Sequence, residues 1–225
     1  TFGGYDGRLM LRILAVGMTP FLIIGVDNIM IISMNAILQS YGGAELGDRL
    51  VTCATIVQSY LLLITMPMGG LTLGSQPVVS FNYGAANLER IKRAIQSIVA
   101  LCVTFCVLMT VVTHTLSPVF VGLFTQNPEV AARSVRYIKV FTAMIIPLAI
   151  QYPLVDETTA LGHVRLALFC SIFRKCVFLA GLLLLPALWG IDGVWLAVTA
   201  AELAALAVTV YMFVTKDQKF HYRHG

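Results

Sequence analysis

The chain has 225 residues, of which 58% are hydrophobic and only 12% are charged, and its formal net charge is +4. A soluble domain carries roughly 25% charged residues, so this chain has too few polar side chains to cover a water-exposed surface and too many apolar ones to be disordered. Because the basic residues are spread over short loops, nucleic-acid binding is excluded as well. The composition predicts a polytopic membrane protein.

Six apolar stretches are long enough to cross a bilayer as helices, which takes about 20 residues. In chain order they are residues 13–38, 50–79, 94–112, 137–155, 166–188 and 194–214. The period-two alternation that membrane β-barrels need is missing from the sequence. The expected fold class is therefore all-α, with residues 1–225 forming a single lobe of six transmembrane helices.

The second stretch contains Pro67 followed by Gly69 and Gly70. Proline removes a backbone donor and kinks a helix, so these residues predict a bend or hinge, although similar kinks occur in bundles that do not move.

Positive charge is distributed unequally over the predicted loops. Eleven of the 15 Lys and Arg residues fall on the side that carries both chain ends, and four fall on the other side. The positive-inside rule then places both termini in the cytoplasm. We expect a multi-pass membrane protein with both chain ends on the cytoplasmic side.

The five cysteines lie in apolar stretches and include no CxxC pair, so we expect free, buried thiols rather than disulfides or a metal site. They are Cys53, Cys102, Cys106, Cys170 and Cys176. The sequence shows no HExxH, GxSxG or Walker motif. We therefore expect neither an enzyme nor a cofactor.

Asp27 is the fifteenth residue of a 26-residue apolar run, which places it near the middle of the membrane. Asn28, Asn35 and Gln39 follow on the same helical face. Amides of this kind often serve only as contacts between helices, but a carboxylate at this depth is costly and suggests function. Gln58, in the second stretch, is a further polar candidate.

Other charged residues lie in the later stretches. Asp156 and Glu157 follow Pro153, where they are either functional or simply hydrated at the membrane interface. Glu202 lies well inside the sixth stretch, and its pairing with Arg174 or Lys175 of the fifth is plausible. For at least one of these two cations we favour an extended side chain that reaches the headgroups.

Residues 69–93 read GGLTLGSQPVVSFNYGAANLERIKR. This segment resembles the end of the eighth helix and the following loop of the multidrug and toxic compound extrusion (MATE) family. The residues that carry the resemblance are Gly74, Gln76, Pro77, Phe81, Asn82, Tyr83, Gly84, Asn87 and Arg90. Residues 17–20 with Asp27 look like the seventh helix. The segment DETTALG and the later FRK look like the junction of the tenth and eleventh helices in MepA-like bacterial members, and GIDGVW looks like the turn before the last helix.

The resemblance implies a protein of twelve spans in two lobes, of which this chain matches the C-terminal lobe. The chain would then be half of a transporter, whether truncated, cleaved or separately encoded. Its partners would be the N-terminal lobe or a second copy, besides the lipid bilayer. Such a transporter exchanges an inward H⁺ or Na⁺ for an amphipathic, often cationic drug across a central cavity.

By the same resemblance, Asp27 matches the acid that binds the coupling cation in some members. A second acid would fall near Ile150 or Gln151, neither of which is acidic. Tyr60, Phe141 and Tyr152 are expected as aromatic wall residues of the cavity. A carboxylate can hold a cationic drug directly, helped by such aromatics.

Two alternatives stay open at this point. A lipid-linked saccharide flippase would need several basic residues in its cavity, and Arg174 and Lys175 are the mid-membrane basic residues that the sequence offers. A membrane assembly partner without transport activity is the other alternative.

Overall fold

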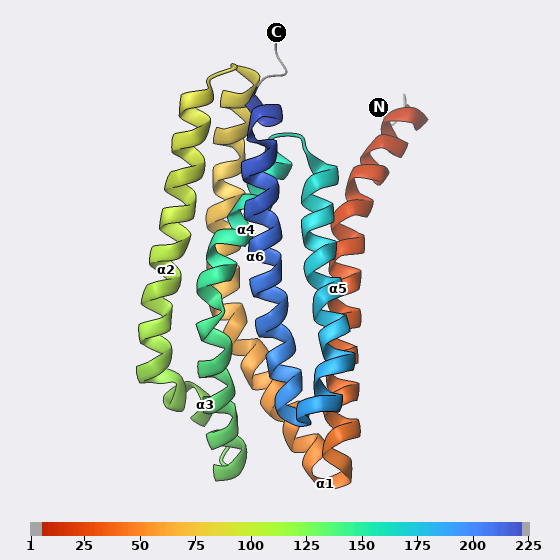
Figure 1. Cartoon of the computed structure of the whole chain (residues 1–225), viewed down its shortest axis with the longest axis vertical. Coiled ribbons are helices and arrows are strands. Elements are labelled where there is room, and N and C mark those ends of the chain that lie inside the picture. The colour runs from red at the N-terminus through yellow and green to blue at the C-terminus, as the bar shows by residue number, and fades with distance from the viewer. Residues whose placement is uncertain (1–5, 222–225) are drawn as a thin grey trace, which may run out of the picture.

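The chain folds into a bundle of long, roughly antiparallel helices (Figure 1). The computed structural model describes residues 6–221, and the side chains of all of these except 12, 13, 15–20, 22, 23, 44 and 216–221. The helices are α1 (Gly7–Gly84), α2 (Leu88–Gly122), α3 (Pro128–Ala143), α4 (Ile145–Ala160), α5 (Val164–Trp189) and α6 (Ile191–His221). The described residues contain no strand, in agreement with the predicted all-α class.

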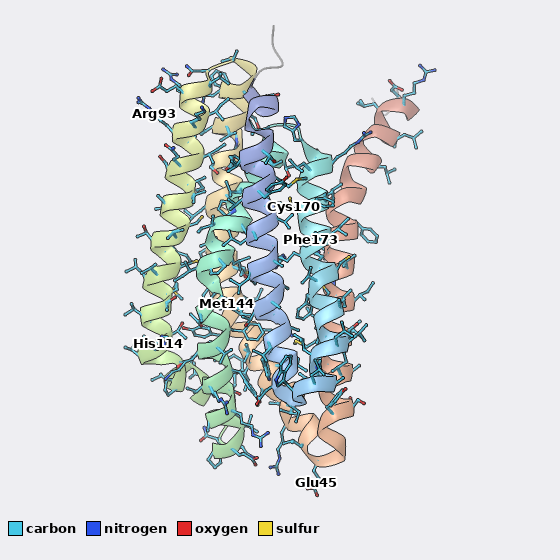
Figure 2. The ribbon with its side chains drawn as sticks, in the orientation of Figure 1. Glu45, Arg93, His114, Met144, Cys170 and Phe173 are labelled. Carbon is cyan, nitrogen blue, oxygen red and sulfur yellow. The ribbon has the colours of Figure 1, made fainter. Side chains whose placement is uncertain are left out.

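The long element α1 consists of two helices that meet at Gly43. This glycine has φ 66° and ψ −168°, a backbone conformation that side chains strongly disfavour. The chain reverses here, at the end of the bundle where Figure 2 labels Glu45. A side chain at Gly42 would lie 2.6 Å from the backbone of Gly47, so the two glycines also let the two arms meet closely.

Five membrane spans can be recognised among the described residues. Four are single helices that are long and apolar enough: Glu45–Gly84, Leu88–Gly122, Val164–Trp189 and Ile191–Thr215. The fifth is the pair α3 and α4, which are bent by 49° relative to each other. The predicted stretch 13–38 falls in the first arm of α1, where several side chains lie outside the described residues, so this sixth span stays a prediction.

The stretch predicted as one helix over 137–155 is therefore a broken span that covers 128–160. The break is at Met144 (Figure 2). Pro147 has no N–H group and cannot donate to the carbonyl of Ala143, which removes the helical bond at this point. The other spans extend beyond their predicted ends because polar turns continue each helix past its apolar centre.

A main core draws on both arms of α1 and on each of the helices α2 to α6. Tyr137 of α3 stacks on Trp195 of α6 with ring centroids 4.0 Å apart, and Phe141 meets the same indole edge-on. On α6, buried Ala197, Ala201 and Ala205 form a stripe at four-residue spacing. Small residues of this kind let membrane helices approach closely, and a side chain at Gly181 of α5 would lie 3.0 Å from Ala197.

The family-like segment 69–93 forms the end of α1, a short turn and the start of α2. Asn82 is buried and donates to the carbonyl of Val78, and Gly84 ends the helix. Asn87 caps α2 by accepting a hydrogen bond from the backbone N–H of Arg90 at 3.2 Å. Gln76 and Tyr83 are half-buried, whereas the side chains of Pro77 and Arg90 are exposed. The motif residues therefore shape a helix end rather than gathering at one point.

Four of the five cysteines are buried, as expected, and all five are free thiols. The expectation of burial is wrong for Cys176, whose side chain is exposed on the outer face of α5.

Candidate functional site

Asp27, on the first arm of α1, forms an ion pair with Lys175 of α5. The carboxylate Oδ1 and the ammonium Nζ are 2.8 Å apart. The two partners are unequally covered, because the Lys175 side chain is 3% exposed and the Asp27 side chain 46% exposed. In Figure 1 the first arm of α1 lies at the edge of the bundle beside α5.

A second ion pair lies directly next to the first along α5. Arg174 Nη1 is 2.8 Å from Oε1 of Glu202 on α6. Phe173, the residue before this pair, is labelled in Figure 2 on the upper half of α5. The structure therefore places Arg174 and Lys175 against carboxylates on neighbouring helices, rather than extended toward headgroups.

Asp156 and Glu157, near the end of α4, lie against the second arm of α1. Thr72 donates a hydrogen bond to Oδ2 of Asp156 at 2.6 Å, and Ser75 donates one to Oε1 of Glu157. Glu157 is 0% exposed. The sequence left two interpretations of these acids open, a functional role or hydration at the membrane interface. Hydration at the interface is therefore wrong for Glu157.

Tyr152 of α4 lies within range of the charges of Asp156, Arg174 and Asp27. Its hydroxyl lies 3.4 Å from the position that a side chain at Gly69 would take, so the glycine leaves room for it. Of the three aromatic residues expected in a cavity wall, Tyr152 is the one that faces the charged groups.

The other two aromatic residues lie inside the helix packing. Tyr60 is buried, with its hydroxyl 2.8 Å from that of Thr113 and its ring edge-on to Phe120. Phe141 is buried against Trp195. Tyr60 and Phe141 therefore both pack in the hydrophobic core.

The amide side chains that were expected to share one face of α1 make separate contacts. Asn28 donates back to the carbonyl of Ile24 at 2.9 Å, and Gln39 donates to Asp48 across the hairpin at 3.2 Å. The side-chain oxygen of Asn35 is buried without a hydrogen-bond partner. Gln58 is half-buried on the second arm. The structure does not bring these amides together around Asp27.

The helix runs without a break through Pro67, Gly69 and Gly70, since Gly43 is the non-helical residue inside α1. In Figure 1 the second arm of α1 is oblique near the hairpin and upright near Gly84, so its direction changes along its length. Gly70 is exposed, and a side chain there would meet nothing within 4 Å. The hinge stays a prediction.

Sequence reasoning missed the roles of Thr72 and Ser75. Their hydroxyls are three residues apart on one helical face, directly after Gly69 and Gly70, and that spacing is the signal that could have found them. The described residues hold no group of three or more His, Cys, Asp or Glu side chains suited to a metal ion.

A shallow pocket of about 350 Å³ lies apart from these charges, at the hairpin end of the bundle. Its lining comprises Leu46, Arg133, Arg136, Tyr137, Trp189, Ile191 and Asp192.

The chain is similar to known transporters over nearly its whole length. The model of the MatE family matches residues 24–183. The multidrug export protein MepA of Staphylococcus aureus (strain NCTC 8325 / PS 47) is 24% identical over 213 residues, which are 94% of this chain and 46% of that protein. The chain thus spans about half the length of the curated relatives it matches.

Two solved structures of multidrug resistance MATE family transporters of the MOP superfamily share the fold. The outward-facing one superposes with a TM-score of 0.84 at 16% identity, over 97% of this chain and 49% of that chain. The inward-facing one superposes with a TM-score of 0.83 at 15% identity, over 99% of this chain and 51% of that chain. With the family match covering well over half of its residues, this multi-pass membrane chain belongs to the MatE family of multidrug efflux transporters, which are not enzymes.

Proposed function

We propose that the chain forms the C-terminal lobe of a cation-coupled antiporter that exports amphipathic, often cationic drugs from bacteria. In this proposal the lobe has six spans in the inner membrane and both termini are cytoplasmic. The first turn of α1 and the last turn of α6 lie at the same end of the bundle, which supports two termini on one side of the membrane (Figure 1). The relatives supply the rest of the support, since the chain matches half of a longer transporter.

The observation that carries the proposal is the half-exposed carboxylate of Asp27 against the buried ammonium of Lys175. A proton, a sodium ion or a cationic drug can approach the open face of this carboxylate. Each of them competes with Lys175 for the same negative charge. Lys175 then supplies the counter-charge whenever neither drug nor coupling ion is bound, so that a bare carboxylate never remains in a low-dielectric site.

This competition produces exchange. When the coupling ion neutralises Asp27, a cationic drug loses its electrostatic partner and is released. When the ion leaves, the carboxylate can accept the next drug cation, with the ring of Tyr152 nearby to stabilise it. Similar TM-scores to outward-facing and inward-facing relatives support a lobe that moves as one body while the access changes.

The second lobe would be an N-terminal lobe of the same transporter or another copy of this chain. Large apolar side chains are exposed along the first arm of α1, among them Phe21, Ile24, Ile29 and Ile32. A bilayer or a second lobe would cover them. The flippase alternative is weakened because Arg174 and Lys175 are both paired with carboxylates, and are therefore not free to bind a pyrophosphate.

The test is ion release from liposomes that contain this chain, alone and together with an N-terminal lobe, with ethidium as the drug. Proton and sodium gradients are imposed separately, and the gradient that drives exchange identifies the coupling ion. Asp27→Asn should abolish drug-driven release while the protein stays folded. Asp48→Asn, an exposed carboxylate at the hairpin, is the matched control and should exchange normally. Robust exchange in Asp27→Asn would contradict the proposal, and no exchange in any combination would favour an assembly partner.

A further inference from the structure

Asp156 and Glu157 are two adjacent carboxyl groups for which the described residues supply no ion-pair partner. Glu157 is 0% exposed, and its second oxygen, Oε2, is buried without a hydrogen-bond partner. Asp156 is half-buried beside it. Within the described part of the chain, no cationic side chain lies within 4 Å of either carboxylate.

Two ionised carboxylates in this position would be strongly unfavourable. Removing an ion from water into a protein interior costs several kcal/mol, and two like charges on neighbouring residues repel each other in addition. The unpartnered oxygen of Glu157 adds the cost of an unmade hydrogen bond. Binding of a proton by the pair would remove this cost.

The hydroxyl partners show how a proton would fit. Thr72 Oγ1 is 2.6 Å from Oδ2 of Asp156 and 3.0 Å from the backbone carbonyl oxygen of Gly69. A hydroxyl has one hydrogen and can donate to only one of these oxygens at a time. When the carboxyl is protonated, it donates to Thr72, and Thr72 donates to Gly69. When the carboxyl is ionised, Thr72 turns and donates to it.

Ser75 repeats this arrangement one turn further along α1. Its Oγ contacts Oε1 of Glu157 and lies 2.8 Å from the carbonyl oxygen of Thr72. Each carboxyl thus has a hydroxyl that serves both protonation states, because a backbone acceptor accepts the hydrogen in one state and the carboxylate accepts it in the other. The charges of both carboxyls act on Cys102 of α2, and the charge of Asp156 acts on Tyr152 of α4.

We propose that Asp156 and Glu157 form a proton-binding site at the contact of α4 with the second arm of α1, separate from the Asp27–Lys175 pair. Thr72 and Ser75 act as switchable donors in it. Each proton taken up from solvent converts one carboxylate to a carboxylic acid and changes no other bond. Arg174 of α5 and Glu202 of α6 are paired with each other, as Lys175 is with Asp27. The site does not depend on drug export.

The test uses the whole chain in lipid nanodiscs, without drug or gradient, so that its failure is distinguishable from failure of transport. Dicyclohexylcarbodiimide adds to protonated carboxyl groups in apolar surroundings, and mass spectrometry locates the adduct. We expect adducts on Asp156 or Glu157 that decline as the pH is raised and are unchanged by Na⁺ at constant pH. The exposed Glu89 should stay unlabelled. Loss of the adducts on adding Na⁺ at constant pH would overturn the proton assignment in favour of a metal cation.

Infrared spectroscopy gives a second readout on the same samples. Glu157→Gln and Asp156→Asn should each remove about half of the band of buried carboxylic acids, because each removes one of two such groups. Ser75→Ala should shift the Glu157 component alone, and Thr72→Val the Asp156 component alone. Ser59→Ala is the matched control, since this serine bonds only to its own helix, at the carbonyl of Thr55, and should shift nothing. Absence of both the adduct and the band at every pH would overturn the proposal.

Discussion

Lys175 of α5 contacts Asp27 of α1 at 2.8 Å across the helix interface, and the ammonium is buried whereas the carboxylate is half-exposed. The lysine is therefore fixed inside the bundle, and the aspartate is the partner that an incoming cation can reach. This asymmetry distinguishes the pair from the exposed pair of Arg93 and Glu89, where both partners are open to solvent.

A double-mutant cycle should detect the coupling of Asp27 and Lys175. We expect Asp27→Asn and Lys175→Met each to lower the free energy of unfolding by about 1–3 kcal/mol. This is below the full cost of breaking a buried pair, because the carboxylate side of the pair is open. The double variant should cost less than the sum of the two. Thermal unfolding in detergent measures all four proteins. The same cycle on Arg93 and Glu89 should give a coupling of about 0.3–0.5 kcal/mol, and equal couplings for the two pairs would show that burial of Lys175 adds nothing.

Tyr60 holds the second arm of α1 to α2 through a buried hydroxyl. Thr113 already donates to the carbonyl of Met109 at 2.7 Å, so Tyr60 is the donor in their 2.8 Å hydrogen bond. Tyr60→Phe should lower the free energy of unfolding by about 0.5–1.5 kcal/mol, because Thr113 keeps its other bond. Tyr211→Phe, at an exposed site, is the control. If the two variants unfold at the same temperature, the hydroxyl contact is not formed.

Gly193 makes the tight turn between α5 and α6 possible. Together with Gly190, which has φ 61°, it brings the start of α6 against the end of α5. A side chain at Gly193 would lie 2.4 Å from the backbone of Leu185, and a backbone cannot move aside as a side chain can. Gly193→Ala should lower the free energy of unfolding by about 1–3 kcal/mol or more and reduce the yield of folded protein. Gly122→Ala, where nothing lies within 4 Å, should have little effect on thermal unfolding.

The hinge predicted around Gly70 can be tested without disturbing the packing. A side chain at Gly70 meets nothing within 4 Å, so Gly70→Ala should keep the fold or stabilise the helix by about 0.5–1 kcal/mol. If α1 bends there during transport, drug exchange by the assembled transporter should fall while stability does not. Gly25→Ala, at an equally open glycine in the other arm of α1, is the control. Normal exchange in Gly70→Ala, or in the bulkier Gly70→Leu, would count against a hinge.

Much of the architecture follows from the sequence because lipid imposes a simple rule. Apolar stretches of membrane length must be helices, since no water is available for backbone polar groups. This rule predicted the all-α class and the centres of the five spans recognised among the described residues. It did not predict the break at Met144, because a single missing donor at Pro147 leaves the hydropathy of the stretch unchanged.

For the candidate site too, the sequence identified some features and the tertiary structure decided the others. Sequence alone singled out Asp27, Asp156, Lys175 and Glu202, because an ionisable group at membrane depth is costly enough to require a reason. Which charges meet was decided by the tertiary structure: Lys175 contacts the carboxylate of Asp27, Arg174 that of Glu202, and the α4 acids contact only hydroxyls among the described residues. Hydropathy reflects the free-energy cost of placing a residue in the membrane. The rotation and packing of each helix determine which neighbouring side chain compensates its charge.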